Sequence, residues 1–271
     1  MRVTVFTGNQ PRHIALIESL AEVAREVFAV QECTTAFAGE VSDLHRDSDV
    51  MRQYFSRVRE AEAALFGQVR PLPAGVRTLA LRMGEVSRLT PDSFADALGA
   101  DHFIVFGASY LRGPLCDFLV RRQAVNLHMG VSPYYRGSST NFWAMYDGRP
   151  ELVGATLHRL TPGLDSGPVL RHILPEGDFD AFELGMHAVR CAQEALVEML
   201  RDESLAAHPA EPQDRSLELR YSRGSDFTDA IASEYLSRIP NRQEIASALR
   251  RRGQWRFVRG CAPRTACALS E

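Results

Sequence analysis

The sequence predicts an α/β protein with a doubly wound, mostly parallel sheet and a small C-terminal appendage. Short apolar runs alternate with longer amphipathic stretches from residue 3 to about residue 201, as strands and helices alternate in such folds. The chain has 271 residues, of which 45% are hydrophobic and 24% charged, the composition of an ordinary soluble globular protein. We therefore expect one main domain over residues 1–205 and an extension over residues 206–271.

The chain opens with a strand, a tight loop and a helix. Val3 to Phe6 is apolar, and a helical pattern follows the loop Thr7 to His13. This loop lies at the carboxyl end of a parallel strand and at a helix N-terminus, where free backbone amides favour anions. Gly8, Asn9 and Arg12 are therefore candidate substrate-binding residues for a phosphate. The alternative is a strand-to-helix turn that binds no ligand.

A long excursion follows the second strand, which is predicted over Val27 to Gln31. The connection Glu32 to Gly67 contains a predicted helix over Met51 to Phe66 and exceeds what a compact fold needs, so we expect it to form a wall of a substrate pocket. The aromatic residues on that helix are expected to be core. Strands are then predicted over Thr78 to Leu81, His102 to Phe106 and Ala124 to Leu127, with helices over Pro91 to Leu98 and Leu115 to Arg121.

Two polar side chains leave the tip of the strand that ends in V-N-L-H. Asn126 and His128 are two positions apart and project from the same face, while Leu127 turns into the core. Another strand is predicted over Leu152 to Leu160, and the glycine-flanked loop after it presents Asp165. An amide, an imidazole and a carboxylate at one sheet edge are the parts that acyl transfer needs. The alternative is a histidine at a strand end and an aspartate that only forms a turn.

These residues lie within a longer pattern. The run N-L-H-M-G-V-S-P-Y-Y-R-G, followed by G-A-T-L-H-R-L-T-P-G-L-D-S-G, resembles the formyltransferases that use N10-formyltetrahydrofolate. That family includes glycinamide ribonucleotide transformylase, methionyl-tRNA formyltransferase and the sugar N-formyltransferases. The resemblance is strong from about Asp101 to Pro175 and holds in outline before that. Many relatives carry His-Pro-Ser-Leu-Leu-Pro where this chain has His128 to Pro133, a departure that bears on the acceptor more than on the chemistry.

The resemblance implies a Rossmann-like formyltransferase fold, with residues 1–205 as the catalytic domain and N10-formyltetrahydrofolate as co-substrate. In this interpretation Asn126 holds the formyl oxygen, His128 adds a second donor or moves a proton, and Asp165 orients the imidazole or passes the proton through a water. Either His128 or Asp165 is the formal base. We expect His158 to be packed or bonded to the backbone rather than to take part. The expected cofactor-binding residues are Ser109, Tyr110, Leu111, Thr161, Pro162, Gly163 and Leu164.

The implied acceptor is the amine of a small molecule. A nucleotide-linked amino sugar fits the expected anion site at Gly8 to Arg12, and a hydroxyornithine-type amino acid fits nearly as well. Residues 206–271 are too few for the barrel with which methionyl-tRNA formyltransferases bind tRNA. Two alternatives come from other classes: a formyltetrahydrofolate hydrolase, which we expect to carry a further N-terminal domain, and a non-catalytic nucleotide-binding module.

Composition excludes several classes of function. The net charge is −3, so no nucleic-acid partner is expected, and arginine supplies all 31 basic residues, which excludes a lysine Schiff base. Five cysteines without metal-ligand spacing predict a reduced, cytoplasmic protein with no metal. No signal peptide and no membrane-length apolar run are present, so no membrane partner is expected. A homodimer is left open.

The C-terminal third is expected to contain helices over Thr140 to Tyr146, with Trp143 in the core, and over Phe182 to Arg201. Arg250 to Arg252 contacts phosphate or nucleic acid in one interpretation and is a solvated helix end in the other, which we expect. The tail Cys261 to Glu271 has no periodicity and is predicted to be disordered.

Overall fold

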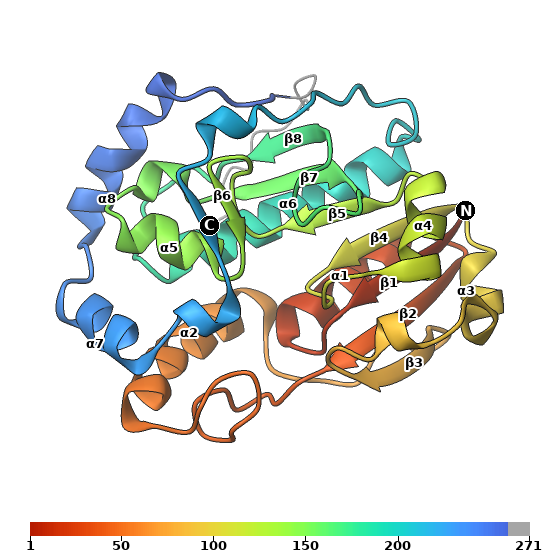
Figure 1. Ribbon diagram of the computed structural model, residues 1–271, viewed down its shortest axis with the longest axis horizontal. Coiled ribbons are helices and arrows are strands. Elements are labelled where there is room, and N and C mark those ends of the chain that lie inside the picture. The colour runs from red at the N-terminus through yellow and green to blue at the C-terminus, as the bar shows by residue number, and fades with distance from the viewer. Residues whose placement is uncertain (260–271) are drawn as a thin grey trace.

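A seven-stranded sheet runs through the part of the chain that the computed structural model describes, residues 1–259 (Figure 1). The strand order is β3-β2-β1-β4-β5-β7-β8. The first five strands along this order are parallel, β7 pairs antiparallel with β5, and the edge strand β8 pairs antiparallel with β7. The α/β fold with a mostly parallel sheet is confirmed. The strands are β1 (Arg2–Thr7), β2 (Glu26–Cys33), β3 (Arg77–Arg82), β4 (His102–Phe106), β5 (Val125–His128), β7 (Ala155–Arg159) and β8 (Val169–Ile173).

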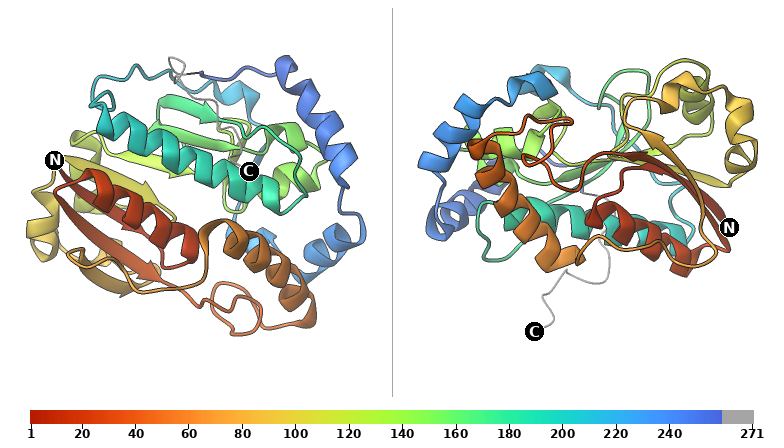
Figure 2. Two further views of the ribbon diagram at one scale, coloured as in Figure 1. Left: turned by 180° about the vertical axis from the view of Figure 1, so that it is seen from behind. Right: turned by 90° about the horizontal axis from the view of Figure 1, so that it is seen from below.

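Helices cover both faces of the sheet. Figure 2 shows α1 (Pro11–Val23) and α6 (Glu183–Arg201) side by side on one face, with α3 (Ala95–Leu98) and α4 (Gly113–Arg121) on the other. Strand side chains alternate between two separate hydrophobic clusters, so that Val5 joins the cluster under α1 and Phe6 joins the one under α4. The site residues on the strands are therefore held by packing on both sides.

The long connection after β2 folds into a loop and the helix α2 (Asp49–Phe66). Ser48 caps this helix by accepting a hydrogen bond from the Met51 amide, and Gly67 ends it with a positive φ of 75°. The helix extends beyond the sheet and packs against α6 and α7 (Asp229–Ser237). It thereby forms a wall beside the carboxyl ends of the strands.

The segment after residue 205 returns along the molecule instead of standing apart. Its strand β9 (Arg220–Ser222) pairs in parallel with β6 (Tyr135–Gly137). Phe227 and Tyr235 join the same hydrophobic cluster as β1 and α6. The remaining helices are α5 (Thr140–Tyr146) and α8 (Arg242–Leu249), and short 3-10 turns occur at Val86–Arg88, Pro91–Phe94, Pro150–Leu152, Arg215–Leu217, Gly224–Asp226 and Arg250–Gln254.

Two arginines of the cluster near the end of the described chain, Arg251 and Arg252, make internal contacts. Arg252 donates to the carbonyl oxygens of Glu151, Val153 and Pro175, and Arg251 pairs with the Glu151 carboxylate. Arg252 therefore fastens α8 to the turn before β7. The predicted disordered tail, residues 261–271, lies outside the described residues. Among residues 1–259, no helix has the length and apolar character needed to cross a membrane.

Candidate active site

The centre of the site is the pairing of β5 with β7. Asn126 lies directly opposite His158 in the antiparallel register, and His128 lies opposite Thr156. Because side chains directly opposite in such a pair project from the same face, Asn126 and His158 meet, with 2.9 Å between Asn126 Nδ2 and His158 Nε2. Leu127 is buried in the core, as its alternation predicts.

Asp165 approaches these side chains from the loop after β7. Its Oδ1 lies 3.3 Å from His128 Nδ1 and accepts a hydrogen bond of 3.3 Å from Asn126 Nδ2. Its Oδ2 accepts a hydrogen bond of 3.0 Å from the Gly137 amide. Asp165 has a positive φ of 46°, a left-handed conformation that aspartate tolerates better than most residues. The structure thus brings the three predicted catalytic side chains together.

The charges of the pair are set by burial and by the hydrogen bonds. Burial alone would raise the pKa of Asp165, but His128, His158 and the Gly137 amide outweigh it and lower the pKa to about 2. Burial lowers the pKa of His128 below its ordinary value, and the nearby Asp165 carboxylate offsets only part of this effect. At neutral pH the site therefore holds an ionised carboxylate beside a neutral imidazole.

The second nitrogen of His128 also faces acceptors. Its Nε2 lies 3.3 Å from the Tyr135 carbonyl oxygen and 3.4 Å from Thr140 Oγ1, and the Thr140 hydroxyl itself donates to the Met129 carbonyl. Both ring nitrogens could therefore donate in the charged form, while burial disfavours that form. Opposed influences of this kind suit a group that takes up and releases a proton during a reaction.

His158 has a larger part in the site than the sequence suggested. Its Nδ1 lies 2.8 Å from the Arg159 carbonyl oxygen, so the expected bond to the backbone is confirmed. That bond places the proton on Nδ1 and leaves Nε2 to accept from the Asn126 amide. The two amide hydrogens of Asn126 are consequently directed at His158 and Asp165. Sequence reasoning missed this contact because it depends on the strand register.

The loop that carries Asp165 is held by the C-terminal segment. Gln213 Nε2 donates to the Asp165 carbonyl at 3.0 Å and to the Gly167 carbonyl at 2.7 Å. Arg136 donates to the Leu164 carbonyl and forms a partly buried ion pair of 2.5 Å with Glu218. Two elements that follow the main domain in sequence thus fix the position of the candidate catalytic carboxylate.

The two loops predicted to bind the cofactor lie next to each other. The Tyr110 hydroxyl donates to the Pro162 carbonyl, and Ser109 is held through its amide and its hydroxyl by the buried Glu32 carboxylate. A cavity of about 670 Å³ is lined by Ser109, Tyr110 and Leu164 together with the three candidate catalytic residues. Leu111 is buried beneath this loop, and Thr161, Pro162 and Gly163 lie outside the lining.

The predicted anion loop has an internal partner. Arg12 Nη1 pairs with Glu62 of α2 at 2.7 Å, and the same carboxylate accepts from the Arg12 amide at 3.1 Å. The His13 ring lies where a side chain on Gly8 would stand, and Asn9 exchanges hydrogen bonds with the Thr34 backbone. Glu62 therefore takes the position expected for an external anion. No sequence signal marked this glutamate, which lies on the buried face of an amphipathic helix.

Residues 1–259 contain neither a cluster of metal-ligating side chains nor an activated thiol among Cys33 and Cys116. In this part of the chain no group of histidine, cysteine, aspartate or glutamate is placed to hold a metal ion. Burial raises the pKa of the Cys33 and Cys116 thiols, so neither is prepared as a nucleophile at neutral pH.

Comparison with known proteins places this geometry in context. No family model matches the chain. Its sequence is 30% identical over 156 residues to the methionyl-tRNA formyltransferase of Chlorobium chlorochromatii, covering 55% of this chain and 49% of that protein. It is 34% identical over 107 residues to the methionyl-tRNA formyltransferase of Anaeromyxobacter dehalogenans, covering 39% of this chain and 34% of that protein. The matches thus span a third to a half of these relatives' own lengths. The curated relatives that the chain matches are thus formyltransferases, and each match covers about half of this chain or less.

Solved formyltransferase structures share the fold. A sugar N-formyltransferase from Shewanella sp. FDAARGOS_354 aligns with a TM-score of 0.52 and 15% identity, covering 100% of this chain and 99% of that one. A 4-N formyltransferase from Francisella tularensis aligns with a TM-score of 0.50 and 14% identity, covering 85% of each chain. The predicted formyltransferase fold is confirmed.

Proposed function

We propose that this protein is a member of the formyltransferase family and moves the formyl group of N10-formyltetrahydrofolate to the amine of a small molecule. The observation that carries the proposal is the meeting of Asn126, His128 and Asp165 on the wall of one cavity. Asn126 Nδ2 and His128 Nδ1 each lie 3.3 Å from the same carboxylate oxygen of Asp165. An amide donor, an imidazole and an ionised carboxylate at one point supply what acyl transfer to nitrogen requires.

Each of the three residues has a different role in the proposed reaction. The bond from the acceptor nitrogen to the formyl carbon forms, the bond from that carbon to N10 breaks, and one proton moves from the acceptor nitrogen to the departing nitrogen. We infer that Asn126 turns one amide hydrogen from His158 or Asp165 to the formyl oxygen as negative charge develops there. The neutral His128 takes up the proton, and Asp165 stabilises the imidazolium while the proton is held.

The donor fits the cavity between the two loops described above. Its volume of about 670 Å³ lies within the range of small-molecule sites. Ser109, Tyr110 and Leu164 would hold the donor, which supplies the formyl carbon. Glu32 keeps Ser109 in place through two hydrogen bonds, so the donor loop is preorganised.

Two acceptors are candidates. A nucleotide-linked amino sugar is supported by the whole-chain alignment with a sugar N-formyltransferase of the same fold. A hydroxyornithine-type amino acid, which carries no phosphate, is supported by the Glu62 carboxylate that already pairs with Arg12 and its amide. Both would present a neutral amine to His128.

The test is release of tetrahydrofolate from the formyl donor on mixing with the protein and with candidate amines, followed by mass spectrometry of the amine. We expect release that requires an amine and a product heavier by one formyl group. Release at the same rate without any amine would instead assign a hydrolase. The panel includes initiator methionyl-tRNA, because the two relatives compared above are named methionyl-tRNA formyltransferases. No release with any acceptor, although the donor binds, would favour a binding module.

A further inference from the structure

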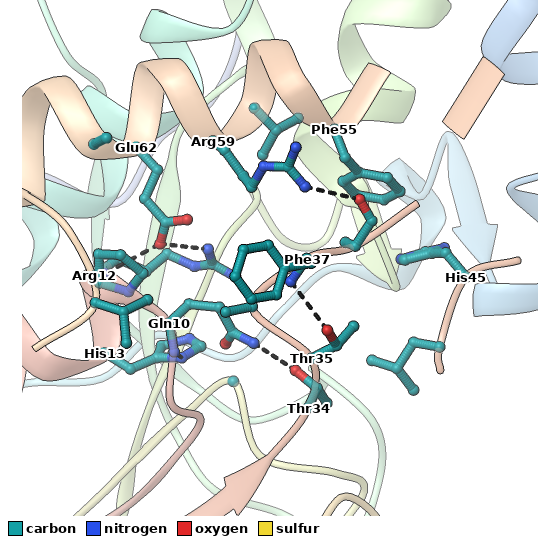
Figure 3. A pocket seen from close by; sticks show the side chains of 18 of the residues that line it. Gln10, Arg12, His13, Thr34, Thr35, Phe37, His45, Phe55, Arg59 and Glu62 are labelled. Carbon is teal, nitrogen blue, oxygen red and sulfur yellow. Dashed lines mark hydrogen bonds and ion pairs between the residues drawn. The ribbon is translucent and has the colours of Figure 1, made fainter. Parts of the chain in front are cut away.

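A second cavity of about 630 Å³ adjoins the candidate active site. It is built by the start of α1, by the long connection after β2 and by one face of α2 (Figure 3). His45, Gly107 and Met129 line both this cavity and the one that contains Asn126, His128 and Asp165. The two spaces therefore meet beside Met129, directly after the β5 histidine. A molecule in the second cavity could extend its reacting end to that histidine.

One wall of this cavity is apolar and open to solvent. Phe37, Leu44 and Val69 line it with exposed fractions of 57%, 60% and 55%, values unusual for large hydrophobic side chains. The His45 ring packs against Phe55 with centroids 4.5 Å apart. Figure 3 shows Phe37 in the middle of the labelled side chains, with Arg59 above it and Gln10 below it in this view. This wall offers contact to a flat or apolar body.

The opposite wall carries charge, but its charges are used internally. Arg12 pairs with Glu62, and Arg59 donates to the Ala38 carbonyl and pairs with Glu40. Three carboxylates, those of Asp43, Glu60 and Glu62, line the cavity against the two guanidinium groups of Arg12 and Arg59. A diphosphate would enter a space with an excess of negative charge, in which both guanidinium groups already pair with a carboxylate.

Two buried donors of this lining, Arg12 Nε and His13 Nε2, have no hydrogen-bond partner within the described chain. His13 is 2% exposed, and its Nδ1 accepts from the Gln10 amide, so its Nε2 carries the hydrogen in the neutral ring. That Nε2 has no hydrogen-bond partner among residues 1–259. A buried donor left unpaired is costly, and an oxygen atom of a ligand would satisfy it.

We propose that this cavity holds the non-reacting part of the acceptor, an inference that rests on the function proposed above. This part of the acceptor is an apolar or aromatic body with one hydrogen-bonding oxygen and no phosphate. The apolar wall takes the body, His13 donates to the oxygen, and the Arg12–Glu62 pair excludes phosphate. Of the two candidate acceptors, the nucleotide-linked one is therefore disfavoured.

The experiment measures binding by calorimetry with tyramine, phenylethylamine, uridine diphosphate and thymidine diphosphate as probes. We expect the two arylalkylamines to bind the wild-type protein and to lose about tenfold in affinity in Phe37→Ala, the size of one aromatic contact. Val41→Ala is the matched control, because Val41 is 52% exposed on the same loop but does not line the cavity. Its affinities should match the wild type.

The diphosphates test the other half of the proposal. They should give no binding heat with the wild type and should begin to bind in Glu62→Gln, which removes the negative charge that pairs with Arg12. Diphosphate binding to the wild type that weakens in Phe37→Ala would overturn the proposal and assign the cavity to a nucleotide. Absence of binding by both amines, or equal weakening in Phe37→Ala and Val41→Ala, would also overturn it. Amine binding without any formyl transfer would leave this cavity assigned while the transferase proposal fails.

Discussion

Replacing Asp165 by asparagine tests whether its carboxylate is the charged centre of the site. The side chain keeps its size and can still accept from the Gly137 amide, but the negative charge 3.3 Å from His128 Nδ1 is lost. Lowering the pKa of Asp165 from 3.8 to about 2 corresponds to about 2 kcal/mol of folding stability at neutral pH. We expect Asp165→Asn to be destabilised by roughly this amount and to lose about 10²-fold or more in turnover.

The pH dependence separates this effect from a packing defect. A carboxylate with a depressed pKa stabilises the fold fully above its unfolded pKa and loses that contribution as the pH falls through its folded value, here between about pH 4 and pH 2. The stability gap between wild type and Asp165→Asn should therefore shrink by about 1 kcal/mol from pH 7 to pH 3, measured by urea unfolding. Asp117→Asn, an exposed carboxylate on α4, is the control and should show no such change. A gap of equal size at both pH values would refute the reasoning.

Three further predictions concern the neighbours of this carboxylate. Asn126→Ala and His128→Ala should each lower turnover by about 10²-fold or more, with unfolding curves close to wild type. Full activity of His128→Ala would show that the active site is wrongly assigned. Because burial lowers the pKa of His128, the acid limb of the kcat/KM profile should lie below pH 6.5; a limb above that value would contradict a neutral resting imidazole. Gln213→Ala removes the hydrogen bonds to two carbonyls of the Asp165 loop, so kcat should fall while the KM for the donor stays within about twofold of wild type. The free energy of unfolding should fall by about 1 kcal/mol. An unchanged kcat would show that Gln213 does not position Asp165 for the reaction.

The sequence predicted the order of strands and helices well, because buried strands and amphipathic helices leave periodic patterns. It did not predict that β7 runs antiparallel to both of its neighbours, β5 and β8, because an apolar pattern carries no information on strand direction. The strand Val169–Ile173 also escaped notice, because the polar Arg171 and His172 interrupt its apolar pattern. Direction and edge pairing depend on tertiary contacts rather than on local propensity.

For the site, the motif predicted which side chains would meet, and the structure places Asn126, His128 and Asp165 in contact. The partners supplied from far along the chain were missed. Glu62 and Gln213 each lie in a segment that reads as ordinary helix or loop, and nothing local indicates that either would bond to a residue of the site. Such partners become visible only when the fold brings distant segments together.

The contact between Gln213 and the Asp165 loop has a consequence for synthesis of the chain. The glutamine is added 48 residues after the aspartate carbonyl that it binds, and β9, which pairs with β6, follows later still. While the ribosome is still extending this stretch, the motif is complete in sequence but its acidic loop lacks two of its fastenings. A nascent protein at that stage would therefore hold all three candidate catalytic side chains while the loop that carries Asp165 still lacks its hydrogen bonds to Gln213.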